Sequence, residues 1–400
     1  MEKLPPGFLS LGSGSGSGSA EFSFPDLLGT QRTPPRLPDE IVEEILLCIP
    51  PDDHEHLLCV ALVCKHWARL LTSRGFRRRY RERHRTPLLL GFLGNLIDTG
   101  GYARFIPTHA FRPVRPDRHD YRAHDARHGR VLLNRIARCG DVFQGVEAAL
   151  IVWDPITDEQ WPLPPLLRDQ PVRNWTAAVL CATAGAAGLG TCDHLGCRPG
   201  DFHVIFVGID DKEMFASVYS SDSATWSEST SANLPYDYLH EAVLPALAGN
   251  ALYFVFRMGM AMLKYDLATR VMSVMHVPIS WYPRRVVPMA MEDGGLGLAE
   301  VDMESNLILW SMEVSADGNV EQWVVSRHIE LRTLLPAHAL AFCVVAVADA
   351  VGVIFVYTVD GVYTFDLNSG QVTKVLSYGF YDIIPFVSFY TPVLRAALDR

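Results

Sequence analysis

Residues 37–71 read LPDEIVEEILLCIPPDDHEHLLCVALVCKHWARLL, and their apolar residues recur at three and four residue steps, the period of one helix face. The first helix is expected over residues 37–49. Pro38 suits its first position, and the acidic residues that follow complement the helix dipole. A Pro-Pro pair ends it, and two shorter helices follow over residues 55–62 and 63–71. Such small helices bury little apolar surface, so they either cap a larger domain or bind a partner.

The order and spacing of these residues resemble the F-box, over roughly residues 36–76. Leu37-Pro38 precedes the acidic residues, and Val63-Cys64-Lys65-x-Trp67 leads to a closing Leu-Leu pair. The link PPDDHEH is longer and more polar than the Leu-bearing link common in the family. F-boxes bind the Skp adaptor of cullin-based ubiquitin ligases. The resemblance implies an adaptor-binding face made by Leu37, Pro38, Ile41, Ile45, Leu46, Val63, Cys64 and Trp67.

The formal net charge of −10 is unevenly distributed along the chain. Between Arg77 and Arg138 there are 15 Arg against 5 Asp and Glu, so this segment carries about +10 and the remainder about −20. The acidic total argues against a protein that binds nucleic acid. The densest part, RRRYRERHR at residues 77–85, is interpreted as a basic linker over residues 77–86. A nuclear import signal and a patch for an acidic partner are the alternatives.

Residues 1–35 are rich in Gly, Ser and Pro and lack the apolar core of a signal peptide, so they are expected to form a flexible leader. The eight cysteines show no regular framework, which indicates reduced thiols in the cytoplasm or nucleus. The apolar run ALAFCVVAVADAVGVIFVY, residues 339–357, approaches the length of a membrane span. Asp349 and a Val-Gly pair interrupt it, so it predicts two buried strands and no membrane contact.

From residue 87 to residue 394 the chain consists of short β-branched and aromatic runs bounded by turn residues, which predicts an all-β domain. An internal repeat appears as WDPIT at 153–157, YDLAT at 265–269 and FDLNS at 365–369. Its Asp can accept a backbone N–H two residues further on, as in a hairpin turn. Looser copies are expected to start at Tyr219 and Trp310.

The repeat period near fifty residues, with about four strands per unit, predicts a β-propeller. Six or seven blades are expected after the three helices, so the fold class is a small helical F-box followed by an all-β ring. The closing segment, residues 377–390, is expected to pair with the first blade. The region 88–392 also resembles the F-box-associated domains of plant F-box proteins, in the phrases IVWDPITDEQWPLPP, GNALYFVF with LKYDLATR, and VYTFDLNSGQ.

Motifs for catalysis or cofactor binding are absent from the sequence: there is no Walker loop, no GxGxxG after a strand and no HExxH. Cys192, His194 and Cys197, with His203 nearby, are possible zinc ligands, but their spacing is unusual and no second pair answers them. A polar loop is the preferred interpretation. We therefore expect no metal, no cofactor and no enzymatic activity in this chain.

Propellers bind partners through loops on one face, where Trp, Tyr and Arg are favoured contact residues. Two sets of residues fit this description. One is aromatic and lies near Pro or charged residues; the other is a basic loop suited to an acidic or phosphorylated target. The candidate target-binding residues are Trp175, Tyr236, Trp281, Arg112, Arg115 and Arg118. The alternative is that the aromatic rings simply cover blade edges.

Together these features predict the substrate-recognition subunit of a Skp–cullin–F-box ubiquitin ligase. The helices would bind the Skp adaptor, and through it a cullin, while the propeller would bind a target protein. Two alternatives remain open. One is a small-molecule-binding or enzymatic propeller with the helices as a cap. The other is an F-box protein that binds the adaptor without entering a cullin complex.

Overall fold

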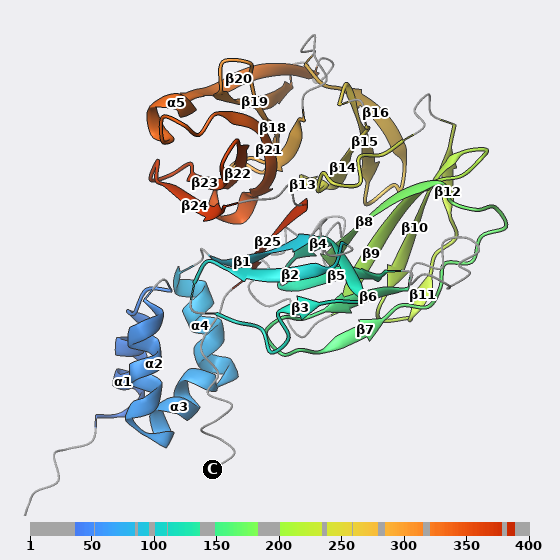
Figure 1. Ribbon diagram of the computed structural model, residues 1–400. Helices are drawn as coiled ribbons and strands as arrows, with labels where there is room; N and C mark the ends of the chain where they lie inside the picture. The colour runs from blue at the N-terminus through green and yellow to red at the C-terminus, as the bar shows by residue number, and fades with distance from the viewer. Residues whose placement is uncertain are drawn as a thin grey trace, which may run out of the picture. The chain divides into compact units, whose positions relative to one another are not determined.

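A computed structural model of the chain contains a helical unit and a β-propeller (Figure 1). The structure describes residues 37–388 except 52, 85–86, 96–100, 110, 137–148, 183–200, 234–237, 258, 279–284, 315–320 and 378–381. The expected leader therefore lies outside the described residues, as do Tyr236 and Trp281.

The helical unit contains four helices: α1 (Asp39–Leu47), α2 (His54–Val63), α3 (Lys65–Thr72) and α4 (Arg74–His84). Two of these helices have an N-terminal cap made by a side chain. The carboxylate of Asp53 accepts the N–H of His56 at 3.2 Å, and the thiol of Cys64 accepts the N–H of Trp67 at 3.5 Å. Asp53 belongs to the unusually polar link between α1 and α2, so this link supplies the cap of the second helix.

The basic run that we interpreted as a linker forms most of α4. The rings of Phe76 and Tyr80 are fully buried. The Tyr80 hydroxyl donates to the carbonyl of Ile49 at 2.9 Å, and His84 Nε2 lies 2.9 Å from the carbonyl of Leu47. These contacts satisfy carbonyl groups just at and beyond the end of α1. The run is thus an amphipathic helix that completes the helical unit.

Two ion pairs add to this packing. Arg79 Nη1 lies 2.6 Å from the carboxylate of Glu43, and Arg79 Nη2 pairs with Glu44. Glu43 and Glu44 thus pair with α4, whereas Asp39 and Glu40 lie in the first turn of α1, where the helix dipole favours negative charge.

The propeller consists of six antiparallel sheets, which confirms the lower of the two expected blade counts (Figure 1). From inner to outer strand, blade 1 contains β25 (Asp382–Ser388), β1 (Leu88–Asn95), β2 (Ala103–Pro107) and β3 (Asp117–Arg118). Blade 2 contains β4 (Tyr121–Arg127), β5 (Arg130–Arg135), β6 (Leu150–Trp153) and β7 (Gln160–Pro162). Blade 3 contains β8 (Asn174–Cys181), β9 (Phe202–Ile209), β10 (Met214–Ser220) and β11 (Thr225–Trp226), with β12 (Thr230–Ala232) also paired to β10.

Blades 4 to 6 have the same plan. Blade 4 contains β13 (Ala246–Ala248), β14 (Ala251–Val255), β15 (Ala261–Asp266) and β16 (Met272–His276). Blade 5 contains β17 (Val287–Ala290), β18 (Leu296–Val301), β19 (Asn306–Val314) and β20 (Glu321–Glu330). Blade 6 contains β21 (Ala341–Ala348), β22 (Val353–Thr358), β23 (Gly361–Asp366) and β24 (Val372–Leu376). A short helix, α5 (Leu331–Leu334), connects blades 5 and 6.

The ring is closed by its last strand. β25 pairs antiparallel with β1, from Leu88 opposite Ser388 to Asn95 opposite Asp382, and Figure 1 shows red β25 beside cyan β1. This confirms the expected pairing of the closing segment with the first blade. Because the inner strand of blade 1 comes from the other end of the domain, this pairing joins the two ends of the ring.

Apolar cores lie between adjacent blades and continue around the ring. At the closing junction, the Phe92 ring of blade 1 meets the Phe355 ring of blade 6 edge to face, with centroids 5.3 Å apart. Residues of alternating strand positions therefore fill both faces of each sheet, which explains the nearly continuous apolar runs in the sequence.

The sequence repeat corresponds to one hairpin turn used three times, between the third and outer strands of blades 2, 4 and 6. The Oδ1 atoms of Asp154, Asp266 and Asp366 each accept the N–H two residues on, at 2.8, 3.0 and 2.8 Å. They also accept the next N–H. These bonds lower the pKa of Asp266 below its usual value. The predicted role of the repeated Asp is confirmed.

The two looser copies of the repeat have different outcomes. The copy that starts at Tyr219 is the turn between β10 and β11, where the hydroxyls of Ser223 and Thr225 are 2.9 Å apart. The copy that starts at Trp310 is wrong as a turn, because Trp310 lies inside β19 and pairs with Val325. Trp310 and Ser311 belong to one long strand, and Ser315, which ends the copy, lies outside the described residues.

The long apolar run forms two strands of blade 6, as predicted. β21 and β22 are joined by a short 3₁₀ turn, and Gly352 has φ +65°, a conformation that suits glycine. Among the described residues, none of the helices combines the length and apolar character of a membrane span.

Candidate partner-binding surfaces

α1 carries apolar side chains on its exposed side as well as on its buried side. Ile41 and Ile45 are 47% and 53% exposed, and their spacing of four places them on one side of the helix. Leu46 is 1% exposed. Leu46 was expected on the adaptor-binding face, but it lies in the interior, because it is one position out of phase with the isoleucines.

Other members of the expected face are accessible. Leu37, Pro38, Val63 and Cys64 are exposed, and Trp67 is half-buried. Leu62, which the sequence analysis did not select, is the most exposed large apolar side chain of the described helices. The sequence could have indicated Leu62, because it directly precedes Val63, which was selected, and the two residues form the apolar end of α2. Exposed apolar residues of this kind indicate a surface that a partner covers.

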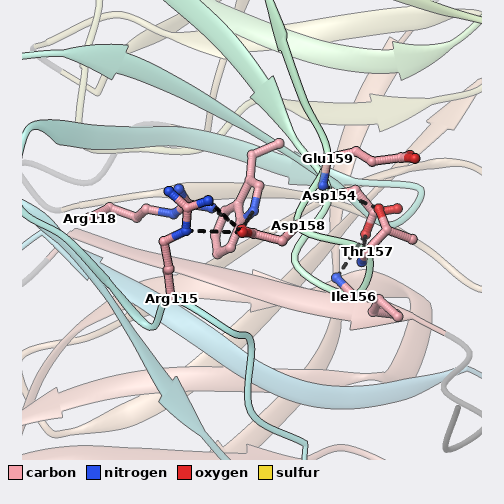
Figure 2. A network of polar contacts seen from close by, with 8 residues as sticks. Arg115, Arg118, Asp154, Ile156, Thr157, Asp158 and Glu159 are labelled. Atoms are coloured by element: carbon pink, nitrogen blue, oxygen red, sulfur yellow. Dashed lines mark hydrogen bonds and ion pairs between the residues drawn. The ribbon is translucent and has the colours of Figure 1, made fainter. Parts of the chain in front are cut away.

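The predicted basic site on the propeller is divided between buried and exposed side chains. Figure 2 shows Arg115 and Arg118 directed toward Asp158. Arg118 is 5% exposed; its guanidinium lies 3.7 Å from the centre of the Trp153 ring, and Nη2 donates to Asp158 at 2.9 Å. Trp153 Nε1 donates to the same carboxylate oxygen at 3.0 Å. Burial lowers the pKa of Arg118 from its ordinary value. Arg118 thus joins blade 1 to blade 2 and is not placed to contact a target.

Arg115 and Arg112 are accessible. Arg115 is 63% exposed and donates to the other oxygen of Asp158 at 3.0 Å. Arg112 is also exposed, and its guanidinium donates to the carbonyl of Phe111 at 2.8 Å and to that of His109. Both cations lie in the segment between β2 and β3. That Arg112 and Arg115 bind an acidic target stays a prediction.

The two arginines on Asp158 allow a matched comparison. Arg118→Met is expected to lower the free energy of unfolding by about 2 kcal/mol, because it removes a buried guanidinium from its carboxylate and ring. Arg115→Met is expected to cost less than about 1 kcal/mol, as for other exposed ion pairs. Chemical denaturation of the full chain measures both. Equal effects of the two substitutions would contradict the assignment of Arg118 as the brace between blades.

Trp175 lies at the start of β8 and is half-buried. Its ring stacks on Phe206 with centroids 5.2 Å apart and contacts the His124 ring at 4.5 Å. Burial lowers the pKa of His124 to about 4, so the imidazole is neutral at pH 7. These contacts favour the alternative in which the aromatic rings cover blade edges, since Trp175 of blade 3 packs against His124 of blade 2.

A polar cluster that the sequence did not reveal lies at the starts of the inner strands. Because every blade is an antiparallel meander, the six inner strands run in the same direction, and we call the end where they start the entry end of the ring. There Arg122 of β4 pairs with Asp382 of β25 at 2.5 Å, and Asn174 of β8 donates to Glu241 at 2.7 Å.

Arg285 extends this cluster toward blades 5 and 6. It donates to the carbonyl of Val345 at 3.3 Å and to that of Ala242. Burial and the Arg285 charge lower the pKa of His240 to about 4. The cluster therefore contains arginines, carboxylates and neutral imidazoles. Groups of this kind can contact a polar partner through ion pairs and hydrogen bonds. No local pattern marks it, because its members are up to 260 residues apart.

Exposed apolar residues surround this entry end. Six of them lie in loops that lead into inner strands or join second and third strands: Leu167, Tyr238, Met260, Met303, Leu340 and Val359. The seventh, Phe342, lies near the start of the inner strand β21. Phe342 is the extra residue of a β-bulge between Ala341 and Cys343, which turns its ring outward. Exposed apolar side chains gathered at one end of the ring indicate a surface that a partner covers.

Metal ligands do not gather in the part of the chain that the structure describes. His203 lies in β9, where burial lowers the pKa of its imidazole. The other three candidate ligands, Cys192, His194 and Cys197, lie outside the described residues.

Comparison with protein families gives two matches. Residues 34–79 match the F-box domain, and residues 123–394 match the family described as "F-box protein AT5G49610-like, beta-propeller". An F-box followed by a propeller is the organisation of F-box substrate-recognition proteins. The chain belongs to this AT5G49610-like family of plant-type F-box proteins. Both resemblances noted in the sequence are thereby confirmed, and a non-catalytic role is the one that the family suggests.

No curated protein matches the chain. Among solved structures, the extracellular domain of a hybrid two component system from B. thetaiotaomicron has a TM-score of 0.32 at 10% identity, covering 64% of this chain and 27% of that one. The Mitotic Checkpoint Complex has a TM-score of 0.31 at 11% identity, covering 65% of this chain and 76% of that one. The chain thus spans about a quarter of the first of these structures.

Proposed function

We propose that this chain is the substrate-recognition subunit of a Skp–cullin–F-box ubiquitin ligase, acting in the cytoplasm or nucleus. The observation that carries the proposal is the F-box match over helices that expose Leu37, Ile41, Ile45 and Val63. F-box domains in general bind Skp-type adaptors. The helices bind such an adaptor by burying these apolar side chains, and the adaptor connects the chain to a cullin.

The propeller holds the target protein at its entry end. Support comes from the apolar rim, from Leu167 round to Val359, and from the polar cluster around Arg122 and Asp382. The chain contributes proximity, because it keeps a lysine of the target near the ubiquitin-loaded enzyme. No bond is made or broken by the chain itself.

Adaptor binding provides the test. Ile45→Asp in the full chain is expected to weaken binding of a purified Skp adaptor at least about tenfold, because a carboxylate would be buried without a partner in the interface. Val271→Asp is the matched control: Val271 is similarly exposed, at 58%, but lies in a propeller turn. Isothermal titration measures both. A wild-type chain that fails to bind the adaptor, or equal losses in the two variants, would refute the proposal.

A further inference from the structure

Buried charges join blades 2, 3 and 4 inside the ring. Asp125 of β4 accepts the N–H of Val179 of β8 at 2.9 Å, and it pairs with Arg127 at 3.2 Å. Arg127 also donates to the carbonyl of Pro245, just before β13. One carboxylate and one guanidinium therefore connect three inner strands. The pair by itself is neutral.

A second carboxylate reaches the same place from blade 6. Asp349 directly follows β21, and its side chain accepts a hydrogen bond from the N–H of Ala290 at the end of β17. Its Oδ1 atom is buried and, within the described part of the chain, has no hydrogen-bond partner. The charged groups that face it both come from β4: Arg127 attracts its negative charge and Asp125 repels it.

This arrangement leaves one guanidinium to balance two carboxylates: the buried one of Asp125, and that of Asp349, a half-buried residue whose Oδ1 atom is enclosed. When all three groups are ionised, the interior carries a net charge of −1, and burying such an excess charge is costly. Protonation removes the excess and turns the Asp349 carboxyl into a donor. Burial accordingly raises the pKa of Asp349 to about 6, and it also raises the pKa of Asp125. Asp125 keeps the direct ion pair, so Asp349 is the group that takes the proton.

We infer that Asp349 is a proton-binding device of the propeller, which strengthens the contact of blade 6 with blades 2 and 5 as the pH falls below neutral. The ordinary pKa of the group is 3.8, so between about pH 4 and pH 6 the folded chain binds a proton that the unfolded chain does not. The contribution of Asp349 to the free energy of unfolding therefore becomes more favourable as the pH falls through 6. Above pH 7 the ionised carboxylate opposes folding in full.

The test compares the full wild-type chain with Asp349→Asn, whose amide imitates the protonated carboxyl. Chemical unfolding is followed by tryptophan fluorescence, since seven of the eight tryptophans lie beyond residue 87. At pH 8 the unfolding constant of Asp349→Asn is expected to be lower than that of the wild type by up to about a hundredfold. Between pH 8 and pH 5 this advantage is expected to shrink about tenfold.

Asp360→Asn in the same blade provides a control of opposite sign. Hydrogen bonds from Lys374 and Thr358 hold the pKa of Asp360 well below its usual value, so its loss is expected to destabilise the chain, most at high pH. Asp349→Ala, which also lacks the titrating group, is a second variant should the amide fit poorly. An advantage of both Asp349 variants that does not change with pH, or their lower stability at pH 8, would overturn the inference.

Discussion

Gly361→Ala is expected to lower the free energy of unfolding of the propeller by about 2–5 kcal/mol. Gly361 begins β23 with φ +140°, a conformation that side-chain-bearing residues rarely adopt. A Cβ atom there would lie 2.0 Å from the carbonyl oxygen of Leu376 in the neighbouring strand β24. The backbone of two paired strands would have to separate, so strain and overpacking add together.

Gly370→Ala is the matched control for this effect. Gly370 also has positive φ, +70°, but a Cβ atom there meets nothing within 4 Å. Its substitution should cost about 1 kcal/mol, the penalty of a left-handed residue alone. Denaturant unfolding of the full chain measures both variants. If they lose the same stability, the close approach of β24 to Gly361 does not constrain the blade.

Tyr80→Ala is expected to destabilise the helical unit by about 3–5 kcal/mol and to weaken adaptor binding as a consequence. The ring is 1% exposed, stacks on Phe76 with centroids 5.7 Å apart and contacts the His84 ring at 4.4 Å. Truncation leaves a cavity, and it removes the hydrogen bond to the carbonyl of Ile49. Amide hydrogen exchange of α1–α4 in the full chain measures the loss.

Tyr80→Phe separates the two contributions. It keeps the packed ring and loses only the hydroxyl, so a cost of about 1 kcal/mol is expected. Adaptor binding should be nearly unchanged in this variant. If Tyr80→Ala left both the exchange rates and adaptor binding at their wild-type values, residues 77–84 would act as the linker that the sequence first suggested.

Local patterns in the sequence were sufficient for the fold class. The Asp of the repeated turn bonds to N–H groups two and three residues away, so the motif and its structure are both local, as at Asp266. The apolar period of residues 37–49 likewise reports the helix that contains it. Repetition of a four-strand unit then implied a ring, because blades of this kind bury their faces only against one another.

The roles of individual charged residues were decided by tertiary structure. Arg115 and Arg118 look alike in sequence, yet only Arg118 is enclosed, by a tryptophan and a carboxylate of the next blade. The argument that α4 was a linker failed for a similar reason. The many charged residues of α4 suggested a solvent-exposed segment, but Phe76 and Tyr80 are buried and Arg79 pairs with Glu43 of α1.

The sequence by itself thus determined the order of domains, the turn chemistry and the apolar residues of the F-box helices, since these depend on neighbours along the chain. Only the tertiary structure decided which side chains are free to bind. It buried Leu46 and Arg118, gathered Arg122 and Asp382 from opposite ends of the domain, and placed Asp349 near Arg127. The physical reason is that burial and charge pairing depend on contacts between blades, which sequence spacing does not specify.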